Sequence, residues 1–138
     1  GETVAPSPNK VAHALARNFG WTIVPCGDTA LNLLGLSTQV PSQWIYVSDG
    51  AYKEYTFDNT TIKFKRTTNK EISKVSYKTA LTIQALKALG KESITEQVIL
   101  RLKKILTEKE KEKMLAESKS ATSWVLELIK VICKDEEK

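Results

Sequence analysis

The first half of the chain mixes apolar residues at helical spacing with short runs that are typical of strands. Residues 7–20 repeat apolar side chains every three to four positions. Ser7 and Pro8 form a favourable helix start, because the serine oxygen can accept a hydrogen bond from a free backbone N–H, and Gly20 ends the helix. Residues 21–24 are aromatic and β-branched, so they predict a first short strand.

The most distinctive part of the sequence is residues 26–50, CGDTALNLLGLSTQVPSQWIYVSDG. Asp28 is expected to cap a short helix that ends at Gly35. A tight polar turn follows and leads into residues 44–47, which are aromatic and β-branched throughout and predict a buried second strand. Asp49 then begins a turn.

A β-hairpin is predicted after this stretch. Residues 52–57 alternate aromatic with polar side chains, Asp58-Asn59 is a turn signal, and residues 61–66 form the returning strand. Successive side chains of a strand point to opposite faces, so the returning strand has an apolar face that packs and a cationic face. These faces are formed by Ile62 and Phe64, and by Lys63 and Lys65.

From residue 76 onward the pattern is helical to the end of the chain. Gly90 is expected to end the first of these helices as a left-handed cap. A last helix with an apolar face begins at Ser120 or Thr122. Two stretches have the spacing of a capping box, in which a hydroxyl and a carboxylate each accept from the other residue's backbone N–H: Ser93 to Glu96 and Thr107 to Glu110.

This order predicts an α+β fold: a small mixed or antiparallel sheet with a hairpin, covered by helices, and an all-helical C-terminal half packed on it. The chain has 138 residues, 41% of them apolar, which is enough for a single domain with a hydrophobic core. We expect an α/β part over residues 7–67 and a helical part over residues 76–133.

The cysteines and the hydropathy indicate a cytoplasmic protein that is not in a membrane. Cys26 and Cys133 lie far apart and have no metal-ligand spacing around them, so both are predicted to be reduced. No run of about eighteen apolar residues is present, and no secretory signal is visible.

Positive charge is concentrated in one region. The net charge is +5, and residues 63–78 hold six Lys and Arg residues against one acid, Glu71. Because such side chains neutralise phosphates, these six are candidate contacts to nucleic acid or to a partner: Lys63, Lys65, Arg66, Lys70, Lys74 and Lys78. The alternative is a solvated face whose lysines prevent an edge strand from pairing with another sheet.

Candidate catalytic and metal-binding residues are sparse. His13 is the only histidine and is expected to be a partly exposed helix residue, and neither cysteine has a context that would pair with it. Four carboxylates of the sheet region could be considered a nuclease metal cluster, but helix capping, turns and a solvated strand explain them better: Asp28, Asp49, Glu54 and Asp58. No enzymatic activity and no cofactor are expected.

The distinctive stretch also carries a family resemblance. Gly27, residues 30–41 (ALNLLGLSTQVP), residues 46–50 (YVSDG) and residues 62–67 (IKFKRT) follow one another in an order similar to the core signature of mostly uncharacterised bacterial proteins. These proteins are grouped with the AbiEi-type antitoxins of type IV toxin–antitoxin systems. The resemblance extends from about residue 7 to residue 133.

The resemblance implies a non-enzymatic antitoxin domain. Such a domain opposes the effect of a nucleotidyltransferase-like toxin on its target and need not bind the toxin itself. The resemblance also implies a winged helix-turn-helix ahead of this region, of which residues 1–6 hold at most the trailing edge. Because the chain begins at Gly1 without a Met, we expect it to be part of a longer protein.

A second hypothesis is a nucleic-acid-binding accessory domain of a transcriptional regulator, without antitoxin activity. The signature turn, comprising Ser37, Thr38 and Gln39 together with Asp49, also has two interpretations. Its polar side chains either line a binding groove or hydrogen-bond a tight turn, and the structural role is favoured.

Overall fold

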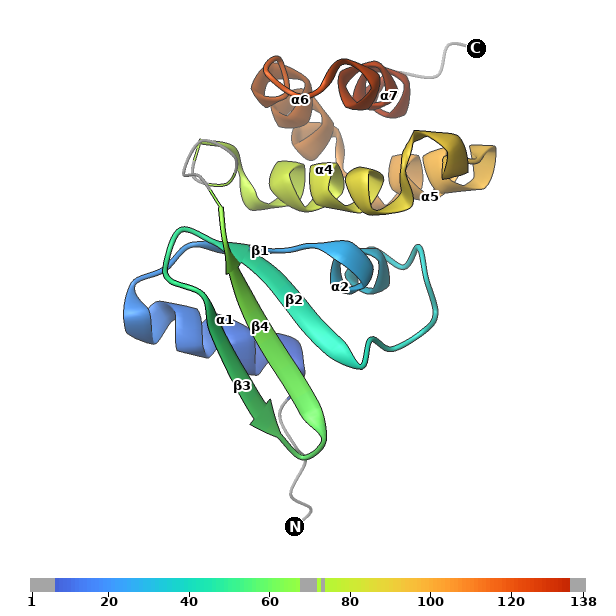
Figure 1. The fold of residues 1–138 in the computed structure, drawn as a ribbon. Coiled ribbons are helices and arrows are strands. Elements are labelled where there is room, and N and C mark those ends of the chain that lie inside the picture. The colour runs from blue at the N-terminus through green and yellow to red at the C-terminus, as the bar shows by residue number, and fades with distance from the viewer. Residues whose placement is uncertain (1–6, 68–71, 73, 135–138) are drawn as a thin grey trace.

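A four-stranded sheet in the order β1-β2-β4-β3 forms the centre of the first half of the protein (Figure 1). The computed structural model describes residues 7–67, 72 and 74–134. The β2 strand pairs with β1 in antiparallel and with β4 in parallel orientation, and β3 with β4 is an antiparallel hairpin. The sheet is therefore mixed, and the predicted α+β class is confirmed. The strands are β1 (Ile23–Pro25), β2 (Gln43–Ser48), β3 (Lys53–Phe57) and β4 (Thr60–Arg66).

The hairpin between β3 and β4 is explained by its two turn residues. Asp58 and Asn59 have φ angles of 46° and 63°, the left-handed conformation that tight hairpins require and that these residue types tolerate. The turn sets the register of β4, in which Ile62 and Phe64 are fully buried, whereas Lys65 on the opposite face is exposed. The predicted alternation of this strand is confirmed.

Helix α1 (Pro8–Phe19) covers one face of the sheet and lies behind it in Figure 1. The Ser7 side chain accepts from the Lys10 backbone N–H, and Gly20 ends the helix at φ 73°, as predicted. Small residues of α1 allow its close approach to the large side chains of the sheet. The resulting cluster contains Ala12, Ala16, Ile23, Trp44, Tyr46, Ile62 and Phe64.

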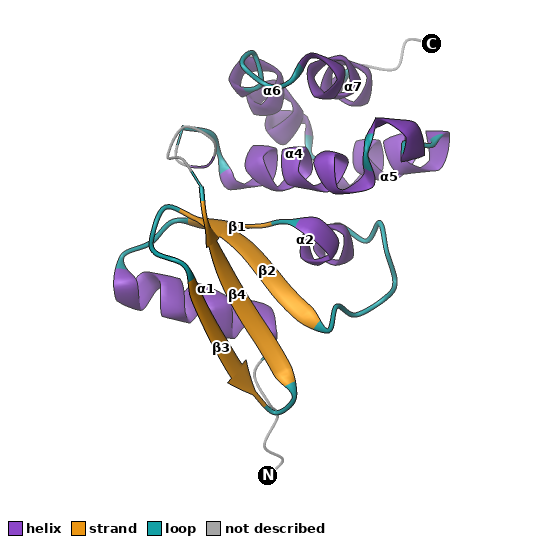
Figure 2. Ribbon diagram, viewed as in Figure 1, coloured by secondary structure: helices purple, strands orange, loops and turns teal. Residues whose placement is uncertain are grey.

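A second hydrophobic cluster joins the sheet to the helical half. Helices α2 (Gly27–Leu33) and α4 (Tyr77–Leu89) pack on each other, α2 contacts β2, and α4 contacts β1. The cluster continues into the remaining helices, which lie beyond α4 in Figure 2. Its buried members include Val24, Leu31, Leu81, Leu86, Leu102, Met114 and Ile129. One continuous core therefore holds the two halves together.

The helical half consists of short helices with identifiable starts. These are η1 (Lys91–Ser93), α5 (Glu96–Ile105), α6 (Glu108–Glu117) and α7 (Ser123–Cys133). The predicted capping box of α6 is present, because the Thr107 side chain accepts from the Glu110 N–H and the Glu110 carboxylate accepts from the Thr107 N–H. Of the two predicted starts of the last helix, Thr122 is the N-cap residue.

Three predictions about helix ends are wrong. Asp28 lies in the first turn of α2, and Cys26 is the N-cap residue, because the helix begins at Gly27 (φ 58°), two residues earlier than expected. Ser93 ends η1, so that Thr95 caps α5 instead. Gly90 does cap α4, but at φ 84° and ψ 150° it is outside the left-handed helical region.

Some predictions concern residues that the structure does not describe. Residues 1–6, where the trailing edge of a preceding module was expected, and most of the predicted loop over residues 67–75 lie outside the described residues. A search of the described helices for a membrane-spanning segment found none.

Candidate functional site

Three cations on β4, Lys63, Lys65 and Arg66, form what we call the basic strand surface. Lys63 and Lys65 project from the sheet face opposite α1, where the described helices α2 and α4 lie over β1 and β2 and leave β3 and β4 open (Figure 1). The Lys63 ammonium lies 3.8 Å from a carboxylate oxygen of Glu54, its register partner on β3. Because the Glu54 side chain is 47% exposed, this ion pair is weak.

The other two cations of this surface are exposed and take part in no ion pair with a described residue. Lys65 lies level with Val47 of β2, and Arg66 is the last residue of β4. Burial raises the pKa of the Cys26 thiol, and the positive charge of Lys65 partly offsets that rise. Lys65 therefore lies near enough to the start of α2 for its charge to act on Cys26.

The alternative explanation of these lysines as protectors of an edge strand is not supported, because β4 lies between β2 and β3. Both of its backbone edges are already paired, so a lysine there cannot prevent sheet-to-sheet pairing. The edge strands are β1 and β3, and of these two it is β3 that carries a lysine. The exposed cation of that strand, Lys53, lies over the Phe19 ring with its ammonium 5.6 Å from the ring centre.

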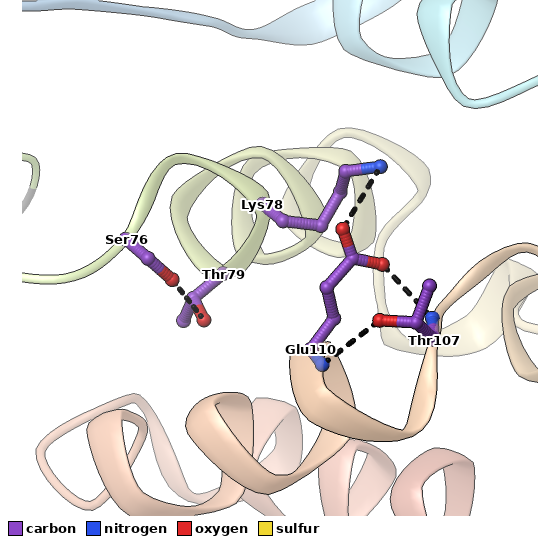
Figure 3. A network of polar contacts seen from close by, with 5 residues as sticks. All are labelled: Ser76, Lys78, Thr79, Thr107 and Glu110. Atoms are coloured by element: carbon purple, nitrogen blue, oxygen red, sulfur yellow. Dashed lines mark hydrogen bonds and ion pairs between the residues drawn. The ribbon is translucent and has the colours of Figure 1, made fainter.

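The remaining predicted cations do not all join this surface. Lys74 is exposed on the connection between β4 and α4, and Lys70 lies outside the described residues. Lys78 is on α4, where its ammonium lies 3.7 Å from a carboxylate oxygen of Glu110 (Figure 3). The structure thus brings Lys63, Lys65 and Arg66 together on one strand and places Lys78 in a different environment.

The signature turn between α2 and β2 is held by hydrogen bonds within the turn and to α2. The Ser37 hydroxyl oxygen accepts from the Gln39 backbone N–H at 3.2 Å, and the Asn32 side-chain amide donates to the Gln39 carbonyl at 2.9 Å. Thr38 and the Gln39 side chain are exposed. These contacts give Ser37 a local structural role of the kind expected in a tight turn.

Asp49 connects two corners of the sheet. Its carboxylate oxygen accepts from the Thr22 backbone N–H at 2.9 Å, across the ends of β1 and β2. The following residue, Gly50, lies against the Trp21 ring, so closely that a Cβ atom at position 50 would overlap the indole. The SDG part of the signature therefore has a packing requirement at its glycine.

The groups that were considered for catalysis are not arranged for it. Burial and the nearby charge of Arg17 lower the pKa of His13, whose ring meets the rings of Tyr46 and Tyr77 edge to face. Cys133 is buried, as is Cys26. Within the described part of the chain, no three metal-binding side chains come together.

One arrangement was not anticipated from the sequence. The guanidinium of Arg101 on α5 lies over Gly35, where a Cβ atom would collide with it, and its Nε–H donates to the Leu34 carbonyl at 3.5 Å. Gly35 was predicted only as the end of α2, and it has φ 74° as such an end requires. No sequence signal points to Arg101, because it lies 67 positions after Leu34.

In a comparison with protein-family models, residues 2–115 match a family of unknown function designated DUF6088. The chain belongs to the DUF6088 family. Neither the search of curated proteins nor the search of solved structures found a match. The DUF6088 region includes the sheet, the signature turn and the residues around Arg101, and it ends within α6.

Proposed function

We propose that this DUF6088 chain is a regulatory domain of the antitoxin type that acts through nucleic acid and not through catalysis. Its partner in function would be a nucleotidyltransferase-like toxin, whose effect it opposes without a requirement for direct binding. The sequence resemblance to AbiEi-like proteins supports the antitoxin role. The basic strand surface supports contact with nucleic acid.

The proposed contact with nucleic acid rests on the exposure of Lys65 and Arg66 and on their lack of ion pairs with described residues. Both are exposed and neither forms an ion pair with a described residue; Lys65 lies on the open sheet face, and Arg66, the next residue, ends the strand. Lysine and arginine side chains in such a position can replace the counterions of a phosphate backbone, which gives affinity that depends on salt and little on sequence. Lys63 adds a third positive charge to the surface, although Glu54 partly neutralises the Lys63 ammonium.

A growth assay tests the antitoxin role. Cells carrying the neighbouring gene would be complemented with this chain and, separately, with the full product of the gene that encodes it. We expect rescue of growth by at least one of them, and weaker rescue when Lys63, Lys65 and Arg66 are all changed to Glu. A matched control changes three exposed lysines of the helical half, Lys91, Lys109 and Lys119, to Glu.

The outcomes separate the two parts of the proposal. A toxic neighbour that neither protein relieves would contradict the antitoxin role. Rescue that is equal for the two triple variants would leave the antitoxin role and contradict the use of the basic strand surface in it. The alternative, an accessory domain of a transcriptional regulator, is favoured if the chain binds nucleic acid through this surface and no neighbouring gene is toxic.

A further inference from the structure

A pocket lies where the sheet half meets the helical half, and we call it the junction pocket. Its volume is about 540 Å³, within the range of about 300–1,000 Å³ that is usual for small-ligand sites. It is bordered by the start of α1, the end of α2, the first turns of α4 and the middle of α5. The lining residues used below are Asn9, Asn32, Gly35, Tyr77, Lys78 and Arg101.

Arg101 offers hydrogen-bond donors to this pocket. Its Nε–H donates to the Leu34 carbonyl at 3.5 Å, and the guanidinium lies over Gly35 because that residue has no side chain. The two terminal NH₂ groups donate to no described residue. A guanidinium at this position matches the geometry of a phosphate, to which it can donate two parallel hydrogen bonds.

Lys78 supplies a second cation from α4. Figure 3 shows its ammonium directed to Glu110, whose other carboxylate oxygen accepts from the Thr107 backbone N–H. The ammonium and the Glu110 oxygen are 3.7 Å apart, beyond the usual length of a charged hydrogen bond, so Lys78 keeps donors for a ligand. The lining residues include two cations and no carboxylate.

The uncharged lining residues suit an organic group attached to an anion. The Oδ1 atom of Asn9 accepts a hydrogen bond from the Tyr46 hydroxyl at 2.8 Å, which leaves the side-chain NH₂ of Asn9 as a donor. Tyr77 is 42% exposed, and its ring meets His13 edge to face. An exposed ring beside polar amides can hold a planar or sugar-like group by stacking and hydrogen bonding.

We propose that the junction pocket binds a phosphate monoester. The phosphate lies on Arg101 and Lys78, and the attached group extends along Tyr77 and Asn9. The same chemistry is found in a free mononucleotide and in the 5′-phosphorylated end of an oligonucleotide, and the test below distinguishes these two sources. The proposal is independent of the antitoxin role, because the pocket shares no residue with the basic strand surface.

Calorimetric titration of the whole chain tests this proposal, with AMP, adenosine and two six-residue oligonucleotides as probes. One oligonucleotide carries a 5′-phosphate and the other does not, so that affinity due to the basic strand surface is the same for both. We expect at least one phosphorylated probe to bind about tenfold or more tightly than its unphosphorylated form, because a charge-assisted bidentate contact is lost without the phosphate. A bound ligand also raises the unfolding temperature.

Variants of α5 show whether the junction pocket causes the preference for the phosphorylated probe. Arg101→Met is expected to remove the preference for the phosphorylated probe. Arg101→Lys is expected to retain part of it, because lysine keeps the positive charge but lacks the two parallel N–H donors of a guanidinium. Lys104→Met is the matched control, because Lys104 is an exposed cation of the same helix that does not line the pocket. Circular dichroism of each variant verifies that the helices remain folded.

The results assign the source of the phosphate or overturn the proposal. Preference for AMP over adenosine indicates a free nucleotide. Preference for the 5′-phosphorylated oligonucleotide alone indicates a nucleic-acid end. The proposal is wrong if neither phosphorylated probe is preferred, or if Arg101→Met and Lys104→Met bind the preferred probe equally well.

Discussion

The basic strand surface and the junction pocket both carry unneutralised cations, but they present them differently. On β4, Lys63 and Lys65 project from an open sheet face about 6.6 Å apart along the strand, and Arg66 lies at the end of the strand. In the junction pocket, Arg101 and Lys78 come from two helices and approach the same space from different sides.

This difference in arrangement determines which kind of anion each region can hold. An open row of cations follows an extended phosphate backbone and recognises charge more than shape. Converging cations with amides and a ring beside them surround one compact group and recognise its shape as well. The two regions can therefore be perturbed separately.

The largest effect on stability is expected at the sheet corner that carries the SDG signature. Gly50→Ala places a methyl group on the Trp21 indole, and such overpacking costs about 1–3 kcal/mol of unfolding free energy. Urea unfolding measures the loss. In a Trp21→Leu background the same substitution should cost clearly less, and an equal cost in both backgrounds would show that Trp21 is not the cause.

A somewhat smaller loss is expected at Gly35, and it should affect the junction pocket alone. Gly35→Ala and Gly20→Ala both place a side chain at φ near 74°, which costs about 1–2 kcal/mol in each case. Gly20 has nothing within 4 Å of an added Cβ, whereas at Gly35 the mobile Arg101 side chain must move. Gly35→Ala should therefore also abolish the preference for a phosphorylated probe.

Gly20→Ala is the control in that experiment, and it should retain the preference. Equal binding by the two glycine variants would mean that the position of Arg101 over Gly35 does not matter to the pocket. Binding of oligonucleotides through the basic strand surface is expected to be unchanged in both variants.

A smaller change concerns Glu54, the acid among the described residues that pairs with the basic strand surface. Glu54→Gln releases Lys63, which should strengthen oligonucleotide binding about two- to fivefold and lower stability by less than about 1 kcal/mol. Fluorescence anisotropy with a labelled duplex measures the affinity. Unchanged or weaker binding would argue that Lys63 is not part of the binding surface.

The smallest effect is a pH dependence that comes from His13. Because burial and Arg17 lower its pKa below 6.5 in the folded protein, the unfolded chain takes up the proton first as the pH falls. The contribution of neutral His13 to stability is therefore complete above pH 6.5, and it is lost as the pH falls through the lower pKa of His13 in the folded protein. The free energy of unfolding of the natural protein should be lower at pH 5.5 than at pH 7.0. For His13→Gln the two values should nearly coincide.

His13 is the only histidine of the chain, so no other side chain with an ordinary pKa titrates in that interval. An equal pH dependence in the natural protein and in His13→Gln would contradict this assignment.

Local features of the fold could be predicted from the sequence because each depends on neighbouring residues. The Ser7 cap, the Asp58-Asn59 turn and the Thr107 capping box are all set within four positions of the chain. The parallel pairing of β2 with β4 could not be predicted, because side-chain alternation says which face a residue takes and not which strand it pairs with.

The same limit applies to the candidate sites. The cationic face of β4 followed from alternation alone, so Lys63 and Lys65 could be placed before the structure was known. The junction pocket depends on Arg101 meeting Gly35 through the packing of α5 beside α2, and no periodic pattern encodes that contact. Lys78 was grouped with the strand cations only because it is near them in sequence, and the fold places it in the pocket.

Contact of the basic strand surface with nucleic acid is tested most directly by a salt-dependent titration of a labelled DNA or RNA duplex with three proteins. These are the natural chain, the variant with Lys63, Lys65 and Arg66 changed to Glu, and the control with Lys91, Lys109 and Lys119 changed to Glu, which alters the net charge equally. We expect the first variant to bind about tenfold or more weakly than the control, with a shallower dependence on salt. Equal binding by the two variants would contradict a role of the basic strand surface in contacting nucleic acid.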